Sequence, residues 1–219
     1  MSQTLKFYTN PMSRGRIVRW MLEEVGCDYE TVLLDYGTTM KAPEYLAVNP
    51  MGKVPAIRHG ETVVTEGAAI CAYLADAFPD AGLAPPPGNP MRGPYYRWLF
   101  FAAGPVEAAV TAKSMGLLAP ADKARMAGYG SFEETIDTLE RAVSQGPYIC
   151  GDQFTAADVY VGSQIGWGMM FGSIDKRPAF EDYFGRLSAR EAFRRASEID
   201  DKLIAEAEAA QEGHETGDG

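Results

Sequence analysis

The segment of residues 49–70 brings together a lysine, a strand start, a glutamate and a helix start. Residues 54–57 predict a strand that begins at a sheet edge or in a loop, because Pro55 has no N–H for a ladder. After a turn, a second short strand leads to a helix N-terminus, with Thr65 expected as the N-cap and Glu66 in the first turn. With Lys53 nearby, such a segment could hold a small peptide that carries an amine and a carboxylate. The alternative interpretation is an ordinary hairpin followed by a helix.

The cysteines and histidines form no pattern that is typical of metal binding. Cys27, Cys71 and Cys150 are widely spaced and odd in number, and the two histidines are isolated. No CxxC or Cys/His cluster is present, which disfavours a zinc site and a disulfide scaffold. Cys27 and Cys71 fall in apolar helical patterns, where a buried thiol acts as a small hydrophobic side chain.

The composition is that of a globular protein with one domain or two modest ones. The chain has 219 residues, of which 46% are hydrophobic and 23% charged, and this is enough apolar material for a core. No apolar run reaches the length of a membrane span, and the first residues lack the apolar stretch of a signal peptide. The net charge of −10 disfavours nucleic acid and membranes as partners. We therefore expect a cytoplasmic protein.

Alternating strand and helix patterns fill the first part of the chain, residues 1–79. They predict the order β-α-β-α-β-β-α, with strands at residues 5–8 and 29–34 before the hairpin described above. Ser13 opens the first helix and Gly26 ends it. The first β-α-β unit requires a parallel pair of strands, and the closing hairpin adds antiparallel strands at the edge.

A proline-rich linker at residues 80–90 separates this part from an all-helical part, residues 91–205. The expected helices lie at residues 91–115, with a kink at Gly104-Pro105, and at residues 122–143, 156–171, 178–187 and 190–205. The expected helix at residues 156–171 opens on a capping-box pattern formed by Thr155 and Asp158. The last residues, 206–219, carry five acidic residues and no lysine or arginine. We expect this acidic tail to be disordered.

In the order and spacing of these features, the chain resembles the glutathione S-transferase family. The resemblance covers nearly all of the chain except the acidic tail. It is carried by residues 49–55 (NPMGKVP), by residues 65–67 (TEG) and by the capping box at residues 155–158. It implies an α/β, thioredoxin-like N-terminal domain, an all-α C-terminal domain and a homodimer. It also implies a cytoplasmic, detoxifying transferase that uses glutathione as co-substrate and needs no metal.

The resemblance assigns the glutathione-binding residues position by position. The backbone of Val54, which precedes the family's cis-proline Pro55, would pair with the cysteinyl part of glutathione as an added strand. Glu66 would accept a hydrogen bond from the γ-glutamyl amine, and the N–H of Gly67 would hold the γ-glutamyl carboxylate at a helix start. Many members have serine where this chain has Gly67. The missing hydroxyl could weaken binding by about 1.5–3 kcal/mol.

Two lysines could neutralise the glycine carboxylate at the other end of glutathione. The family places cations where this chain has Lys53 and, in a looser match, Lys41. Either lysine alone would be typical of a solvated surface, and only Lys53 lies within a matched motif.

Catalysis needs a donor on the glutathione sulfur, because a thiol of pKa roughly 8.5 is mostly protonated at neutral pH and the thiolate is the nucleophile. The resemblance favours Ser13, in the loop before the first helix, whose spacing after Tyr8 is similar to that of serine-type members. Tyr8 is the alternative, since a tyrosine closing the first strand binds the sulfur in tyrosine-type members, but here the interval between Tyr8 and residues 14–16 (RGR) is two residues longer than in those members. Thr9 and Asn10 are weaker candidates, and Ser13 could instead be a plain helix cap. Arg14 would add positive potential near the sulfur. The cysteine-type classes are excluded, because no cysteine lies in this loop.

The electrophile pocket implied by the resemblance lies between the two domains. Apolar side chains from the first loop and from two later helices would line it: Met12, Trp98, Phe101, Trp167 and Met170. Rigid aromatic rings with soft methionines suit hydrophobic substrates of varied shape, although any single one of these side chains could belong to a core.

The resemblance therefore predicts a glutathione transferase that acts on small hydrophobic electrophiles. Two alternatives stay open. A glutathione-dependent isomerase, disulfide reductase or peroxidase would use the same site, and a non-catalytic glutathione-binding or scaffold protein would keep the same fold.

Overall fold

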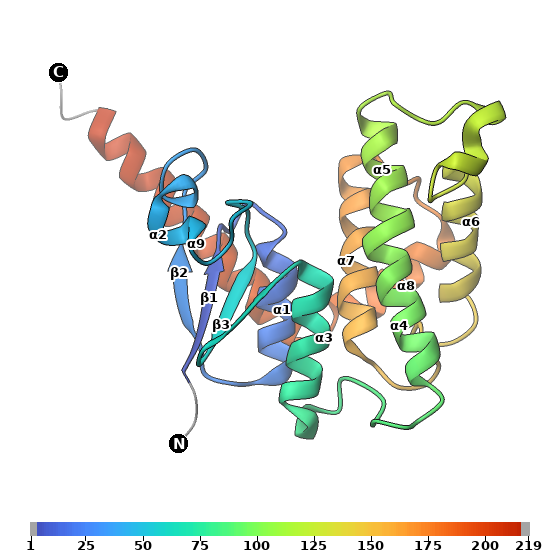
Figure 1. The fold of residues 1–219 in the computed structure, drawn as a ribbon, viewed down its shortest axis with the longest axis horizontal. Helices are drawn as coiled ribbons and strands as arrows, with labels where there is room; N and C mark the ends of the chain where they lie inside the picture. The colour runs from blue at the N-terminus through green and yellow to red at the C-terminus, as the bar shows by residue number, and fades with distance from the viewer. Residues whose placement is uncertain (1–3, 216–219) are drawn as a thin grey trace. The chain divides into compact units, whose positions relative to one another are not determined.

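The computed structural model describes residues 4–215 (Figure 1). Its strands and α-helices are β1 (Leu5–Thr9), α1 (Gly15–Val25), β2 (Glu30–Leu33), α2 (Pro43–Leu46), β3 (Ala56–His59), β4 (Thr62–Thr65), α3 (Gly67–Ala77), α4 (Arg92–Phe101), α5 (Glu107–Ser114), α6 (Phe132–Val143), α7 (Ala156–Phe171), α8 (Pro178–Ser188) and α9 (Glu191–Glu215). The chain forms two compact units. The first combines the chain up to Ile70 with the chain from Glu191 onward, and the second is Cys71–Arg190.

The first unit is built on a four-stranded mixed sheet with the order β2-β1-β3-β4. Strand β1 pairs in parallel with β2 and antiparallel with β3, and β3 pairs antiparallel with β4. The parallel pair and the antiparallel hairpin predicted from the sequence are confirmed. Strand β3 begins at Ala56, directly after Pro55, because a proline cannot donate to the ladder.

Side chains of β1 alternate between the two faces of the sheet. Phe7 is fully buried, and its ring centroid lies 5.1 Å from the guanidinium of Arg19 on α1. Tyr8 points to the opposite face, where its ring centroid lies 5.6 Å from that of Tyr45 on α2. Since successive residues of a strand face opposite sides, β1 separates an α1 face from an α2 face. Val54 packs on the α2 face against the same small core as Tyr8.

Helices α1 and α9 pack against each other within the first unit. Nε of Arg19 lies 2.9 Å from Oδ1 of Asp200, and both side chains are only 1% exposed. Between the same two helices, the rings of Trp20 and Phe193 meet edge-on with centroids 5.0 Å apart. A buried ion pair and an aromatic contact therefore attach the last helix to the first.

Helix α9 extends further than the sequence predicted. Residues 206–215, expected to belong to a disordered acidic tail, continue the helix to Glu215. The cause is composition, because residues 205–211 are only alanine, glutamate and glutamine, which favour helix despite the charge. The rest of the expected tail, residues 216–219, lies outside the described residues.

The second unit consists of helices, as expected, with two differences in detail. The kink expected at Gly104-Pro105 is a π-helical segment, Ala102–Val106, which joins α4 to α5. The helix expected at residues 122–143 begins only at Phe132, after a separate 3₁₀ segment at Ala121–Met126. Gly130 interrupts the helical pattern with a φ of 67°, and Ser131 then caps α6 in a box with Glu134.

Helix α7 lies at the centre of the second unit, and its start is fixed by a buried carboxylate. Asp158 accepts hydrogen bonds from the N–H of Thr155 at 2.9 Å, the N–H of Ile149 at 2.7 Å and the hydroxyl of Tyr183 at 2.8 Å. The capping box predicted from the sequence is therefore confirmed. The Asp158 carboxylate also connects the start of α7 to two other segments. These are the loop at Ile149 and helix α8, which contains Tyr183.

The compact units divide the chain differently from the boundaries expected from composition, which were residues 1–79, 80–90 and 91–205. Helix α9 belongs to the unit that holds the sheet, and the division after Ile70 falls within α3. Composition does not reveal which neighbour a helix packs against. For α9 that choice is made by long-range contacts such as Arg19–Asp200.

Candidate functional site

The segment that precedes β3 presents an open strand start. The Val54–Pro55 peptide bond is cis, as the resemblance implies. Two donors hold the carbonyl of Lys53, the hydroxyl of Tyr45 at 2.6 Å and the amide Nδ2 of Asn49 at 2.8 Å. Within the described chain, no backbone hydrogen bond involves the N–H or C=O of Val54. The backbone of Val54 is therefore held in place and available to an added strand.

A strained backbone turn connects β4 to α3. Glu66 has a φ of 67°, a left-handed value that costs a non-glycine residue about 1–3 kcal/mol and tends to occur at functional sites. Thr65, expected as the cap of this helix, is instead the last residue of β4, and α3 begins at Gly67. The Glu66 side chain is exposed beside this helix start. Unpaired N–H groups at a helix start attract a carboxylate.

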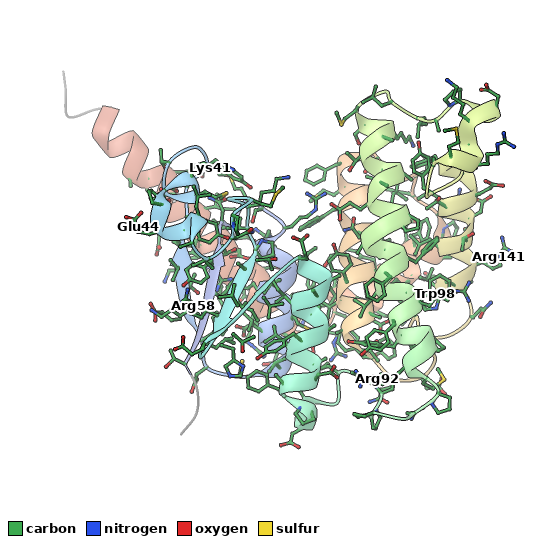
Figure 2. All side chains as sticks on the ribbon, viewed as in Figure 1. Lys41, Glu44, Arg58, Arg92, Trp98 and Arg141 are labelled. Carbon is green, nitrogen blue, oxygen red and sulfur yellow. The ribbon has the colours of Figure 1, made fainter. Side chains whose placement is uncertain are left out.

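The two expected lysines have different surroundings. Nζ of Lys41 donates to the carbonyls of Met51 at 3.0 Å and Gly52 at 2.8 Å, so Lys41 braces the loop before β3 (Figure 2). Gly52 has a φ of 55°, and a Cβ there would lie 2.9 Å from the same Nζ. Lys53 is exposed one residue before Val54. Of the two lysines, Lys53 has the freer side chain.

Ser13 lies in the loop between β1 and α1, and local groups engage its hydroxyl. Oγ of Ser13 donates to the carbonyl of Asn10 at 2.6 Å and accepts the N–H of Gly15 at 2.9 Å. A Cβ on Gly15 would overlap Oγ1 of Thr9, so the chain needs glycine where α1 starts against the end of β1. Ser13 lies one residue before Arg14, the N-cap of α1, and its oxygen is fixed beside the positive end of this helix.

The other candidates of this loop differ in burial and direction. Tyr8 faces α2 and, in the part of the chain that the structure describes, its hydroxyl has no hydrogen-bond partner. Asn10 is buried, with its amide Nδ2 donating to the carbonyl of Leu34 at 2.9 Å. Arg14 is exposed at the residue before α1. Ser13 and Tyr8 both stay candidates for the contact with sulfur.

The side chains expected around an electrophile belong to both units. Met12, in the first unit, is 69% exposed. On α4, the rings of Trp98 and Phe101 meet edge-on with centroids 5.6 Å apart. On α7, Trp167 is half-buried and Met170 is 65% exposed. Exposed methionines suit a binding surface, and a shared pocket for all five residues stays a prediction.

The thiols of the chain are poor nucleophiles. Burial raises the pKa of Cys27, Cys71 and Cys150, and that of Cys150 reaches about 12. A thiol with a raised pKa is protonated at neutral pH and reacts slowly.

Among residues 4–215, no group of three or more histidine, cysteine or acidic side chains is arranged to hold a metal. None of the helices described has the length and apolar character of a membrane span.

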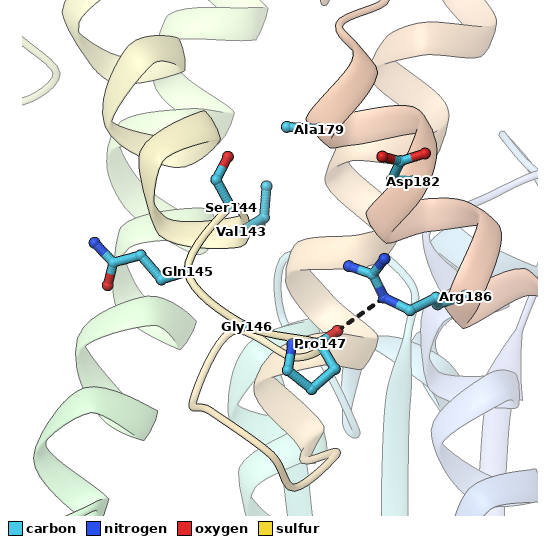
Figure 3. A pocket seen from close by; sticks show the side chains of 8 residues that line it. All are labelled: Val143, Ser144, Gln145, Gly146, Pro147, Ala179, Asp182 and Arg186. Atoms are coloured by element: carbon cyan, nitrogen blue, oxygen red, sulfur yellow. Dashed lines mark hydrogen bonds between the residues drawn. The ribbon is translucent and has the colours of Figure 1, made fainter.

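One pocket of about 520 Å³ lies within the second unit, between the end of α6 and α8 (Figure 3). Its lining residues are Val143, Ser144, Gln145, Gly146, Pro147, Ala179, Asp182 and Arg186. Nε of Arg186 donates to the carbonyl of Pro147 at 3.2 Å across it. The pocket shares no residue with the predicted site.

Sequence reasoning missed the polar supports of the two loops, which are Tyr45, Asn49 and Asn10. A signal for two of them was present, because both asparagines open the tripeptide Asn-Pro-Met. Such asparagines favour Asx turns. In each loop the asparagine Oδ1 accepts the N–H of the methionine two residues later, at 3.0 Å for Asn10 and 3.1 Å for Asn49.

Comparison with known proteins places this geometry in context. The family model described as "Glutathione S-transferase, N-terminal domain" matches residues 3–76, and "Glutathione S-transferase, C-terminal domain" matches residues 108–186. The glutathione S-transferase GstA of Escherichia coli O157:H7 is 29% identical over 168 residues, which cover 74% of this chain and 82% of that protein.

Solved structures agree over a larger share of the chain. A glutathione transferase from Methylococcus capsulatus is 30% identical with a TM-score of 0.75, covering 90% of this chain and 98% of that one. A sphingomonad glutathione S-transferase complexed with glutathione is 31% identical with a TM-score of 0.73, covering 89% and 98%.

Proposed function

Because the chain belongs to the glutathione S-transferase family, we propose that it is a glutathione transferase. In this proposal the first unit holds glutathione and stabilises its thiolate for attack on small hydrophobic electrophiles. The observation that carries the proposal is the open backbone of Val54, two residues before the start of β3. An unpaired strand start is what an extended peptide needs in order to bind by strand addition.

Each part of glutathione has a partner in this proposal. The cysteinyl backbone pairs with Val54, and the γ-glutamyl amine donates to Glu66. The γ-glutamyl carboxylate accepts the N–H of Gly67, where the α3 dipole also favours negative charge. Lys53 neutralises the glycine carboxylate, while Lys41 supports the loop that carries Lys53.

Activation of the thiol is assigned to Ser13. Its hydroxyl donates to the sulfur and favours the thiolate over the thiol, which lowers the pKa of the bound glutathione. The N-terminus of α1 and the guanidinium of Arg14 contribute positive potential at the same place. The thiolate then attacks the electrophilic carbon, a C–S bond forms, and the leaving group departs with the bonding electrons. Tyr8 is the alternative donor.

The second unit supplies the electrophile side of the site. Trp98, Phe101, Trp167 and Met170 provide apolar surface, and Met12 adds to it from the first unit. The raised pKa values of the cysteines support an assignment in which the nucleophile is the thiol of glutathione. By analogy with the family, the protein acts in the cytoplasm as a homodimer.

Two assays test this function together. We expect retention of the protein on immobilised glutathione and turnover of a chloronitroaromatic substrate with glutathione. The proposal is wrong if the protein shows neither and is also inert towards peroxide and disulfide substrates. Turnover of peroxides, disulfides or an isomerisable substrate alone would instead favour a glutathione-dependent peroxidase, reductase or isomerase at the same site.

A non-catalytic glutathione-binding protein is the second candidate. Two observations favour it. The hydroxyl of Ser13 donates to the carbonyl of Asn10 at 2.6 Å, so it is engaged within the protein and not directed to a sulfur. Gly67 lacks the hydroxyl that many members have at this position. Glutathione binding measured by calorimetry, without turnover of any substrate, would support this candidate.

A further inference from the structure

Two loops of the first unit share the tripeptide Asn-Pro-Met, at residues 10–12 and 49–51. Asn10 is 7% exposed and Asn49 is 5% exposed. The Oδ1 of each accepts the N–H of its methionine, and the amide Nδ2 of each donates to a carbonyl outside its tripeptide. That carbonyl is Leu34 for Asn10, at 2.9 Å, and Lys53 for Asn49, at 2.8 Å. One buried carboxamide therefore ties each loop at two points.

The loop tied by Asn10 carries Ser13. The main-chain carbonyl of Asn10 accepts the hydroxyl of Ser13 at 2.6 Å, so Asn10 determines where this hydroxyl points. Ser13 Oγ also accepts the N–H of Gly15 at 2.9 Å, and an accepted hydrogen bond makes a hydroxyl a better donor. Asn10 and Gly15 together hold the oxygen and leave only its hydrogen free to turn.

We propose that Asn10 is a positioning residue for Ser13. Its carbonyl is the resting acceptor of the Ser13 hydroxyl, and its carboxamide keeps the loop in place when that hydroxyl turns to the glutathione sulfur. A thiolate competes well with the carbonyl, because hydrogen bonds to a charged acceptor are about twice as strong. The hydroxyl of Thr9, 3.4 Å from the same carbonyl, remains as its donor. This inference rests on the proposed function.

The test is a pH titration of thiolate absorbance for glutathione bound to variants of Asn10. In Asn10→Ala the loop loses both ties. The pKa of the bound thiol should therefore rise towards its free value, and kcat at neutral pH should fall about tenfold. The dissociation constant of glutathione should change less than about threefold, because other residues hold the peptide. Asn10→Ser can still accept the N–H of Met12 and should restore part of the loss.

The second asparagine provides a matched control. Asn49→Ala loosens the loop before β3 to a similar extent, and should weaken glutathione binding while leaving the pKa of the bound thiol nearly unchanged. In a Ser13→Ala background, adding Asn10→Ala should change kcat less than about twofold, because the residue through which Asn10 acts is already absent.

Three results would overturn the inference. They are an unchanged thiol pKa in Asn10→Ala, fully additive losses in the double variant, and an equal pKa shift in Asn49→Ala. If Asn10→Ala does not fold, Asn10→Ser carries the same test. A normal thiol pKa in glutathione bound to the unsubstituted protein would contradict the proposed activation itself, and the inference with it.

Discussion

The hydroxyl of Tyr45 donates a 2.6 Å hydrogen bond to the carbonyl of Lys53, one residue before Val54. Tyr45 belongs to α2 and is 3% exposed. Through this bond, α2 fixes the position of the backbone segment that would receive glutathione. The position of Val54 therefore depends on a phenol that lies outside the matched motif.

Tyr45→Phe should change the pH dependence of stability in alkaline solution. Burial raises the pKa of Tyr45 from 10.0 to about 12. A raised pKa means that the phenol contributes fully below pH 10 and loses its contribution as pH rises to about 12. The difference in unfolding free energy between the protein and Tyr45→Phe, measured with urea, should shrink across this window. A constant difference would contradict the assignment.

Glu66→Gln should weaken glutathione binding, because the amide removes the charge that accepts the γ-glutamyl amine. The expected loss is about 1.5–3 kcal/mol, the value of a hydrogen bond between charged groups. Calorimetry measures it, with Glu61→Gln in the adjacent hairpin turn as the control. Equal effects of the two substitutions would show that Glu66 has no special contact.

Gly67→Ser should strengthen glutathione binding. The serine hydroxyl would add a donor to the γ-glutamyl carboxylate at the start of α3, worth up to about 1.5–3 kcal/mol. Gly67→Ala adds only the methyl group and serves as the matched control. If alanine improves affinity as much as serine, the gain comes from the backbone and the carboxylate is not bound there.

Asp200→Asn should destabilise the first unit by about 3–5 kcal/mol, because it leaves the guanidinium of Arg19 buried without its counter-charge. Asp201 provides the control, since it pairs with Arg16 but is 65% exposed, and exposed pairs contribute about 0–1 kcal/mol. Urea unfolding measures both. Similar losses for the two variants would mean that the buried pair does not hold α9 in place.

Ser13→Ala should lower kcat by roughly 100- to 1,000-fold, the range expected for removal of one preorganised donor from the reacting atom. Glutathione affinity should change little, because Val54, Glu66 and Gly67 hold the peptide. Tyr8→Phe should stay within about twofold of the unsubstituted protein. Steady-state kinetics with a chloronitroaromatic separate the two, and the reverse pattern would make Tyr8 the donor.

The sheet and several ends of helices and strands could be predicted because local rules determine them. Pro55 limits where β3 can begin, Gly26 ends α1 in the left-handed conformation, and Thr155 with Asp158 marks the start of α7. The helix expected from residue 122 failed for an equally local reason, the break at Gly130. The sequence does not reveal the positive φ of Gly130, because the apolar residues after it are spaced as in a helix.

The remaining features depend on residues far apart in the chain. Asn10 meets Leu34 across 24 positions, and Arg19 meets Asp200 across 181. No periodicity or dipeptide reports such pairs, so neither the Leu34 partner of Asn10 nor the Asp200 partner of Arg19 could be found from the sequence. The left-handed backbone of Glu66 also escaped prediction, since the sequence has no glycine at that position.

A structure of the protein with glutathione bound tests the central claim most directly. We predict that the cysteinyl backbone pairs with Val54 and that the sulfur lies within about 3.2 Å of Ser13 Oγ, with the Ser13 hydroxyl turned away from Asn10. Glutathione bound elsewhere, or a sulfur that contacts the Tyr8 hydroxyl and not Ser13, would contradict this account.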